Sequence, residues 1–256
     1  MSGLAAVFQT GLSRYRSASG RVGGTASNPR PPNRAGILHP DSRRETLVKK
    51  DFVAGLLDSL IHQARKRGLI SEHSELAAID STGLESGHVS MYFGQRCKRK
   101  RHKFPKFWAV IDVAKHLCLS IVPGVGPSPD DPRFHQTAQE AHDRHSFTAL
   151  AGDCGFDGEN HQKFLYEHLG VLGIIPPIRG RPSRDPNHIP GGFYRRFWHE
   201  NWPKHLYSQR WQVESFFSML KRLLDSFLRA RKRWSQHREM CLKAITLNLM
   251  IIAKGK

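Results

Sequence analysis

Residues 207–221 read YSQRWQVESFFSMLK, and this stretch decides how the rest of the chain is interpreted. Drawn as a helix at about 100° per residue, it places four polar side chains within about 60° of one another. The neighbouring arc carries apolar residues at helical spacing. The pattern predicts a helix that buries its apolar face and holds one polar stripe along the rim. The stripe consists of Tyr207, Arg210, Glu214 and Lys221.

Two acidic residues upstream follow short apolar runs. Residues 76–79 (LAAI) lead into Asp80. Residues 147–151 (FTALA) lead into Asp153 after one glycine. Each run predicts a strand that stops where the acid is reached. Because the functional groups of open α/β sheets gather beyond strand ends, Asp80 and Asp153 are expected to share one site.

Apolar periodicity elsewhere predicts a mixed α/β fold, in which an N-terminal helix precedes alternating strands and helices. Stretches rich in Pro and Gly predict irregular segments at 123–132 and 178–203. The other expected elements are a helix at 44–66 ended by Gly68, a hairpin of strands 107–113 and 117–122, a helix at 133–145, a helix through Leu169, a strand at 171–175, and final helices at 207–232 and 236–253.

The composition is strongly basic. The 256 residues include 40 Lys and Arg against 22 Asp and Glu, a formal net charge of +18. Such a surplus favours a polyanionic partner, nucleic acid first and a membrane surface second. No apolar run approaches the roughly 20 residues of a membrane span, and the N-terminus lacks the apolar core of a signal peptide, so a cytoplasmic protein is expected. Residues 1–43, rich in Gly, Ser, Pro and Arg, predict a disordered basic tail.

These residues together resemble the DDE transposases of bacterial insertion sequences. The late-helix signature of that family, Y-x2-R-x3-E-x6-K, is matched at all four positions of the polar stripe. Its first-strand and second acidic motifs resemble residues 79–82 (IDST) and 152–157 (GDCGFD). Each short motif alone is weak, but the three occur in the family's order over roughly residues 76–252, and the joint match is specific.

The resemblance implies an RNase H-like fold, a mixed sheet flanked by helices, with residues 71–256 as the catalytic domain. It implies that Asp80, Asp153 and Glu214 are catalytic and bind two divalent ions, Mg²⁺ with Mn²⁺ able to substitute. Hard cations prefer carboxylate oxygens, and paired metals suit phosphodiester chemistry, so the donor set agrees with this reading. The implied reaction frees a 3′-hydroxyl at the element end by hydrolysis and then joins that hydroxyl to target DNA.

The same resemblance implies DNA contacts around the acids. Arg210 and Lys221 would hold phosphates, and Tyr207 would hydrogen-bond or stack. The basic run at 98–103 is typical of a solvated loop, but in so basic a chain a contact with the DNA backbone is an equal alternative. The implied partners are terminal inverted repeats, target DNA and a second copy of the chain in a synaptic dimer at the bacterial nucleoid. The candidate DNA-binding residues are Tyr207, Arg210, Lys221, Lys98, Arg99, Lys100 and Arg101.

Some features depart from the family or favour a rival reading. Cys154 stands where Lys is common, and the short interval before Glu214 leaves little room for the β-rich insertion that some relatives carry. Two alternatives stay open, an inactive or truncated remnant that only binds DNA and a nuclease of the same fold without strand transfer. Asp157 is expected to cap the following helix, and Asp112 to be structural. The histidines at 135, 142 and 145 lack a matched fourth ligand for zinc.

Overall fold

The computed structural model describes residues 40–86, 103–129, 131–178 and 192–255. The chain divides into two units, residues 1–50 and 51–256, and every strand belongs to the second. The predicted tail and the basic run at 98–101 therefore lie outside the described residues, except for the start of helix α2 (Pro40–Lys66). This helix begins four residues before the predicted position, because proline is well tolerated in a first helical turn. Gly68 follows it at a φ of 67°, as a C-terminal glycine should.

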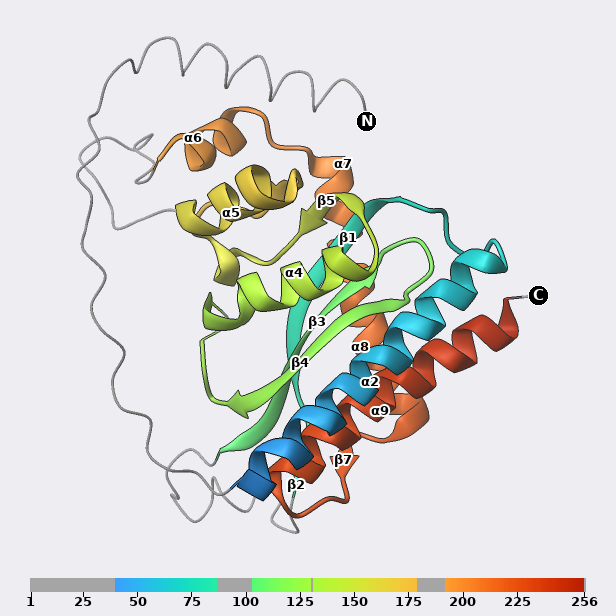
Figure 1. Ribbon diagram of the computed structural model, residues 1–256. Helices are drawn as coiled ribbons and strands as arrows, with labels where there is room; N and C mark the ends of the chain where they lie inside the picture. The colour runs from blue at the N-terminus through green and yellow to red at the C-terminus, as the bar shows by residue number, and fades with distance from the viewer. Residues whose placement is uncertain (1–39, 87–102, 130, 179–191, 256) are drawn as a thin grey trace. The chain divides into compact units, whose positions relative to one another are not determined.

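A five-stranded mixed sheet forms the centre of the second unit (Figure 1). Its strand order is β4-β3-β1-β5-β6. The pairs β1–β3 and β3–β4 are antiparallel, whereas β1–β5 and β5–β6 are parallel. The predicted mixed sheet is therefore confirmed, with the first strand at its middle. The strands are β1 (Ser74–Gly83), β3 (Phe104–Asp112), β4 (Cys118–Gly126), β5 (Phe147–Ala151) and β6 (Leu172–Ile174).

Strand β1 does not stop at Asp80, as the sequence suggested. On one side it pairs with β3 as far as Gly83 opposite Lys106. On the other side its pairing with β5 ends at Ala78 opposite Ala151. The antiparallel partner thus carries β1 past the acid, while the parallel partner ends before it. Asp80 lies at the point where the sheet splits.

The sheet is covered by helices on both faces. One face packs Ile79 and Trp108 into a core cluster with Phe134 of helix α4 (Phe134–Arg144). Opposite residues of an antiparallel pair share a face, so Asp80 lies with Ala109 on the other side. There Phe107 meets Phe217 of helix α8 (Gln212–Leu224) edge to face at 5.6 Å. The acid therefore lies on the face that α8 covers.

The hairpin is longer than predicted. Strand β4 runs through Pro123, which pairs with Phe107, and continues to Gly126. Proline lacks an N–H donor and is accepted where a strand has a neighbour on one side alone. Because β4 is the edge strand, the loop expected from residue 123 begins only after Gly126.

The C-terminal part is divided more finely than the sequence suggested. Residues 193–200 form helix α6 (Phe193–Glu200) within the stretch predicted to be irregular. The predicted helix at 207–232 is instead helix α7 (Lys204–Tyr207), a 3-10 turn η3 (Ser208–Trp211) and α8, which ends at Leu224. A short strand β7 (Phe227–Leu228) follows and pairs in parallel with β2 (Glu85–Ser86).

The last helix, α9 (Arg233–Lys254), agrees with the predicted one at 236–253. It packs against β4, where Asn248 exchanges hydrogen bonds with the backbone of Cys118 at 2.8 and 2.9 Å. The remaining helix, α5 (Glu159–Leu169), ends at Gly170 with a φ of 66°. Within the parts of the chain that the structure describes, no helix has the length and apolar character needed to span a membrane.

Candidate active site

Asp80 lies in β1, and Asp153 lies two residues after the end of the neighbouring parallel strand β5. Ala78 pairs with Ala151, and each aspartate comes two residues after its alanine. The parallel pairing therefore brings both aspartates to the same edge of the sheet, and their sharing of one site stays a prediction.

The two aspartates are held by the same local device. The Ser81 N–H donates to Oδ1 of Asp80 at 2.7 Å, and the Cys154 N–H donates to Oδ1 of Asp153 at 2.7 Å. Each carboxylate is thus oriented by the backbone of the residue that follows it. One oxygen of each is fixed in this way, and in Asp80 the other oxygen faces the late helix.

Arg210 joins Asp80 to Glu214. Its guanidinium lies 2.7 Å from Oε1 of Glu214 and 3.6 Å from Oδ2 of Asp80. The Arg210 side chain is 18% exposed, and that of Glu214 is 58% exposed. The ion pair with Glu214 is more than a solvated i,i+4 pair, because the same guanidinium also meets the acid of β1. One cation therefore holds two of the three predicted catalytic acids.

Tyr207 belongs to the same group. Burial raises the pKa of its hydroxyl, the negative charge of Asp153 raises it further, and Arg210 lowers it. The pKa of Arg210 is raised overall: burial lowers it, but the hydrogen bond with Glu214 and the charges of Tyr207, Glu214 and Asp80 outweigh burial. Tyr207 therefore lies within electrostatic reach of both Asp153 and Arg210.

The four residues of the sequence signature do not lie on the one continuous helix that the sequence predicted. Tyr207 ends α7 and Arg210 lies in the 3-10 turn, so the rotation of 100° per residue applies only from Gln212 onward. In a 3-10 turn residues three apart eclipse each other, which keeps Tyr207 and Arg210 on one side. The predicted stripe is preserved, although the continuous helix is not.

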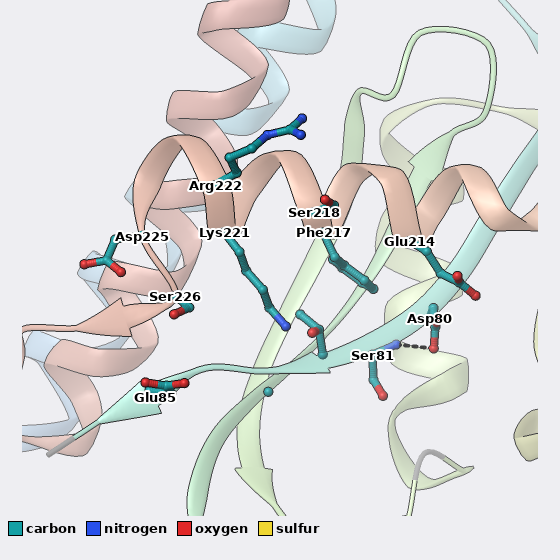
Figure 2. A pocket seen from close by; sticks show the side chains of 12 residues that line it. Asp80, Ser81, Glu85, Glu214, Phe217, Ser218, Lys221, Arg222, Asp225 and Ser226 are labelled. Carbon is teal, nitrogen blue, oxygen red and sulfur yellow. Dashed lines mark hydrogen bonds between the residues drawn. The ribbon is translucent and has the colours of Figure 1, made fainter. Parts of the chain in front are cut away.

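A groove runs from the acids along α8 to the end of β1 (Figure 2). It encloses about 850 Å³. Asp80 and Glu214 lie at one end, and Glu85, Asp225 and Ser226 lie at the other. Lys221 points from α8 across the groove toward β1. Burial lowers the pKa of this lysine, and Glu85 partly offsets that effect.

The groove also includes residues that the sequence reading missed. They carry hydroxyl or guanidinium groups, and all but Ser226, which follows α8, lie on the same two elements as Asp80 and Glu214. Ser81 and Thr82 continue β1 beyond Asp80, and Ser218 lies one turn after Glu214, so helical and strand spacing could have identified them. Those lining residues are Ser81, Thr82, Ser218, Arg222 and Ser226.

The predicted catalytic acids have the chemistry to bind a divalent cation, but in the structure two of them pair with Arg210. Among the described residues no group of three His, Cys, Asp or Glu is gathered closely enough to hold a metal ion. Asp80, Asp153 and Glu214 nevertheless supply only carboxylate oxygens, the donors preferred by Mg²⁺ and Mn²⁺. The like charges of Asp80 and Glu214 would repel each other without a cation nearby, and the guanidinium of Arg210 supplies one.

Two other predicted acids lie in different surroundings. Asp112 is structural, as expected: it accepts from the Ser74 hydroxyl at 2.6 Å and from the Lys115 N–H at 2.7 Å. Asp157 does not cap α5, whose first turn is preceded by Gly158 without a side-chain cap. The Asp157 carboxylate instead pairs with Arg195 on α6, 38 residues away in sequence. This ion pair holds the carboxylate away from the N-terminus of α5.

The histidines at 135, 142 and 145 do not form a cluster. His135 hydrogen-bonds His161 at 2.9 Å, and His145 hydrogen-bonds Ser74 at 2.8 Å. His142 packs edge to face on Phe147. Among the described cysteines, those at 118, 154 and 241 are free thiols.

The chain was compared with known protein families, curated proteins and solved structures. A sequence model of the transposase DDE domain matches residues 72–249. No curated protein matches the chain significantly. A similar solved structure is the catalytic core domain of BIV integrase, with 14% identity and a TM-score of 0.36, covering 72% of this chain and 86% of that one. Together with the strand order, the domain match confirms the expected fold class, an RNase H-like mixed sheet flanked by helices.

Proposed function

Because the chain belongs to the transposase DDE domain family, we propose that it is a metal-dependent DNA transposase whose catalytic acids are Asp80, Asp153 and Glu214. The observation that carries this proposal is the pairing of one guanidinium, that of Arg210, with two sequence-distant acids, Asp80 and Glu214. Asp153 follows β5, the strand that pairs in parallel with the strand of Asp80.

The proposed reaction has two phosphoryl transfers. In the first, a water oxygen bonds to phosphorus at the element end, and the 3′-oxygen leaves as a hydroxyl. In the second, that hydroxyl bonds to a phosphorus of target DNA and displaces a target 3′-oxygen. Asp80, Asp153 and Glu214 would hold two divalent ions, which supply charge stabilisation for the attacking and leaving oxygens when bound.

The chain's own residues orient the DNA. Lys221 lies about two turns beyond Glu214 and points into the groove, where an ammonium would meet a phosphate near the acids. Arg210 carries a fork of donors suited to phosphate as well as carboxylate. Tyr207, beside Asp153 and Arg210, would complete the wall on that side. The proposed partners are DNA bearing terminal inverted repeats, target DNA, and a second copy of the chain.

The test is cleavage of labelled DNA carrying the repeats that flank the gene, with Mg²⁺ or Mn²⁺ and with EDTA as control. Glu214→Gln should lower cleavage by about 10³-fold or more, because a lost ligand removes several kcal/mol of stabilisation at about 1.4 kcal/mol per tenfold. DNA affinity should stay close to that of the parent chain.

Glu167→Gln is the matched control, since Glu167 also forms an i,i+4 pair, with Lys163, away from the groove. Undiminished cleavage by Glu214→Gln would reject the site. Metal-dependent cutting without joining of the 3′-hydroxyl to a target plasmid would identify a nuclease. Binding without cutting by the parent chain would identify a DNA-binding remnant.

A further inference from the structure

Lys243 is a buried cation outside the groove. It lies on α9 and is 9% exposed. Its ammonium donates to the carbonyl oxygens of Leu224, Asp225 and Phe227, at 2.8 Å for Asp225 and 3.2 Å for Phe227. An ammonium has three N–H donors, and these three carbonyls can use all of them.

The three carbonyls mark the end of α8 and the turn into β7. Helix C-termini leave carbonyl oxygens without intrahelical partners, and a cation there also meets the negative end of the helix dipole. Asp225 has φ 71° and ψ 143°, a conformation that residues other than glycine rarely adopt because it strains the backbone. Lys243 therefore stabilises a turn that the local sequence does not favour.

This turn forms the far wall of the groove. Lys221, Arg222, Asp225 and Ser226 all line the groove and lie on the last turn of α8 or directly after it. Beyond them, Glu85 pairs with Phe227 between strands β2 and β7. The backbone N–H of Glu85 donates to the backbone carbonyl oxygen of Ser226 at 2.9 Å. The end of β1 and the end of α8 are thus linked through the segment that Lys243 holds.

We propose that Lys243 is a positioning residue for DNA binding: by holding the α8–β7 turn it places Lys221 and Arg222 in the wall of the groove. The inference rests on the proposed function, because it assumes that the groove receives DNA. Lys243 itself does not line the groove and acts through the backbone of Leu224, Asp225 and Phe227.

A neutral residue could not replace this lysine without consequence. Removal of the ammonium would leave three carbonyls in a partly buried environment without their donor, and polar groups that lose a partner away from water are destabilising. The carbonyls could regain partners only if the turn opened to water. Opening would separate Lys221 and Arg222 from the β1 side of the groove, which is the effect to measure.

The experiment measures the affinity of full-length protein for a labelled DNA duplex by fluorescence anisotropy at several salt concentrations. The variants are Lys221→Ala, Lys243→Met and the double substitution. Lys254→Met is the matched control, because it removes the same charge from an exposed position of the same helix. Lys221→Ala should weaken binding and lower the salt slope by about 1, as expected for one lost phosphate contact.

Lys243→Met should weaken binding by about fivefold and also lower the salt slope. The double variant should bind more tightly than the product of the two single effects predicts, because coupled residues are non-additive, and its loss beyond that of Lys221→Ala reflects Arg222. Lys254→Met should leave affinity within about twofold of the parent. Hydrogen exchange in Lys243→Met should become faster in residues 222–229 and stay unchanged in β1 and β5. Should the methionine variant fail to fold, Lys243→Gln keeps two amide donors and should show the same pattern with smaller changes.

The outcomes separate this inference from the proposed function. If Lys221→Ala binds DNA like the parent, the groove does not receive DNA, and the phosphate role in the proposed function is wrong. If Lys221→Ala weakens binding while Lys243→Met does not, or while the two effects simply multiply, only the role of Lys243 is overturned.

Discussion

Four aspartates lie in or after strands of the same sheet, yet they divide into two pairs. Asp112 and the side chain of Asp157 are each 2% exposed, whereas the Asp80 side chain is 22% exposed. Both oxygens of Asp112 and of Asp157 accept hydrogen bonds from neighbouring groups. Asp80 and Asp153 instead have Oδ1 fixed by the next N–H, and the other oxygen of Asp80 faces a guanidinium that a second acid shares.

The difference shows that a strand-end position alone does not identify a reactive carboxylate. A carboxylate with all its acceptor positions used is an element of architecture, and its removal leaves its partners without a counterpart. A carboxylate held from one side can exchange its remaining partner for another cation. Only the second arrangement suits an acid that must bind metal ions and release them.

The sharpest way to break this comparison uses Asp153 and Asp157, four residues apart. Asp153→Asn should lower metal-dependent cleavage by about 10³-fold, for the same reason as the loss of Glu214, while the free energy of unfolding changes little. Asp157→Asn should do the opposite. It leaves the Arg195 guanidinium, 16% exposed, without its carboxylate, and breaking such a buried pair costs about 3 kcal/mol of unfolding free energy.

Chemical denaturation and cleavage by the folded fraction measure the two properties separately. A large loss of stability in Asp153→Asn, or a loss of activity per folded molecule in Asp157→Asn comparable to that of Asp153→Asn, would remove the distinction between the pairs. Asp112→Asn serves as a second structural control.

The catalytic role of Asp80, Asp153 and Glu214 stays a prediction, but the sequence singles these acids out, whereas it gives no sign of the Asp157–Arg195 pair. Asp80, Asp153 and Glu214 could be found because each lies in a local pattern, two apolar runs and one helical stripe. The pairing of Asp157 with Arg195 has no local signal, since it depends on α6 forming across an intervening stretch rich in proline and glycine. The aromatic spacing of Phe193, Tyr194 and Phe197 could have indicated that helix.

The end of α8 was the other failure, and its cause is also non-local. Apolar residues continue beyond Leu224 at helical spacing, so periodicity extended the helix to residue 232. The chain instead turns at Asp225 because Lys243, from the next helix, binds the carbonyls of the turn. The 3-10 turn before Gln212 also depends on a contact with a residue distant in sequence, because Arg210 in that turn pairs with Asp80 as well as with Glu214.

A smaller effect is expected at Arg210, whose guanidinium pairs with both Asp80 and Glu214. Arg210→Gln removes the cation that competes for Asp80 and Glu214, so the acids should bind Mn²⁺ about tenfold more tightly, as expected when one opposing charge is exchanged for another. Titration calorimetry of the DNA-free protein measures this affinity. Arg210→Lys keeps the positive charge, so its Mn²⁺ affinity should lie between those of the parent chain and Arg210→Gln. Unchanged or weaker Mn²⁺ binding by Arg210→Gln would show that the guanidinium supports the metal site instead of competing for it.

The smallest expected effect is a pH dependence of stability that arises at His145, which is linked through Ser74 to the structural residue Asp112. Ser74 donates its hydroxyl to Asp112, so the Ser74 oxygen accepts from Nε2 of His145, and Nδ1 of that ring has no hydrogen-bond partner among the described residues. Burial lowers the pKa of His145, and the nearby charge of Asp112 opposes this only in part. A proton on the buried Nδ1 would have no acceptor, which agrees with that direction.

Stability should therefore fall as the pH falls below the ordinary histidine value of 6.5. In that range the unfolded chain binds a proton at His145 and the folded chain does not, so unfolding takes up a proton and acid favours it. Urea titrations between pH 7.5 and 5.5 should show the decline in the free energy of unfolding. His145→Gln should make this pH dependence less steep. His142→Gln should leave the contribution of His145 to the pH dependence unchanged. An equal slope in His145→Gln would place the acid sensitivity at other groups and would mean that the hydrogen-bonded chain through Ser74 to Asp112 tolerates a charged imidazole.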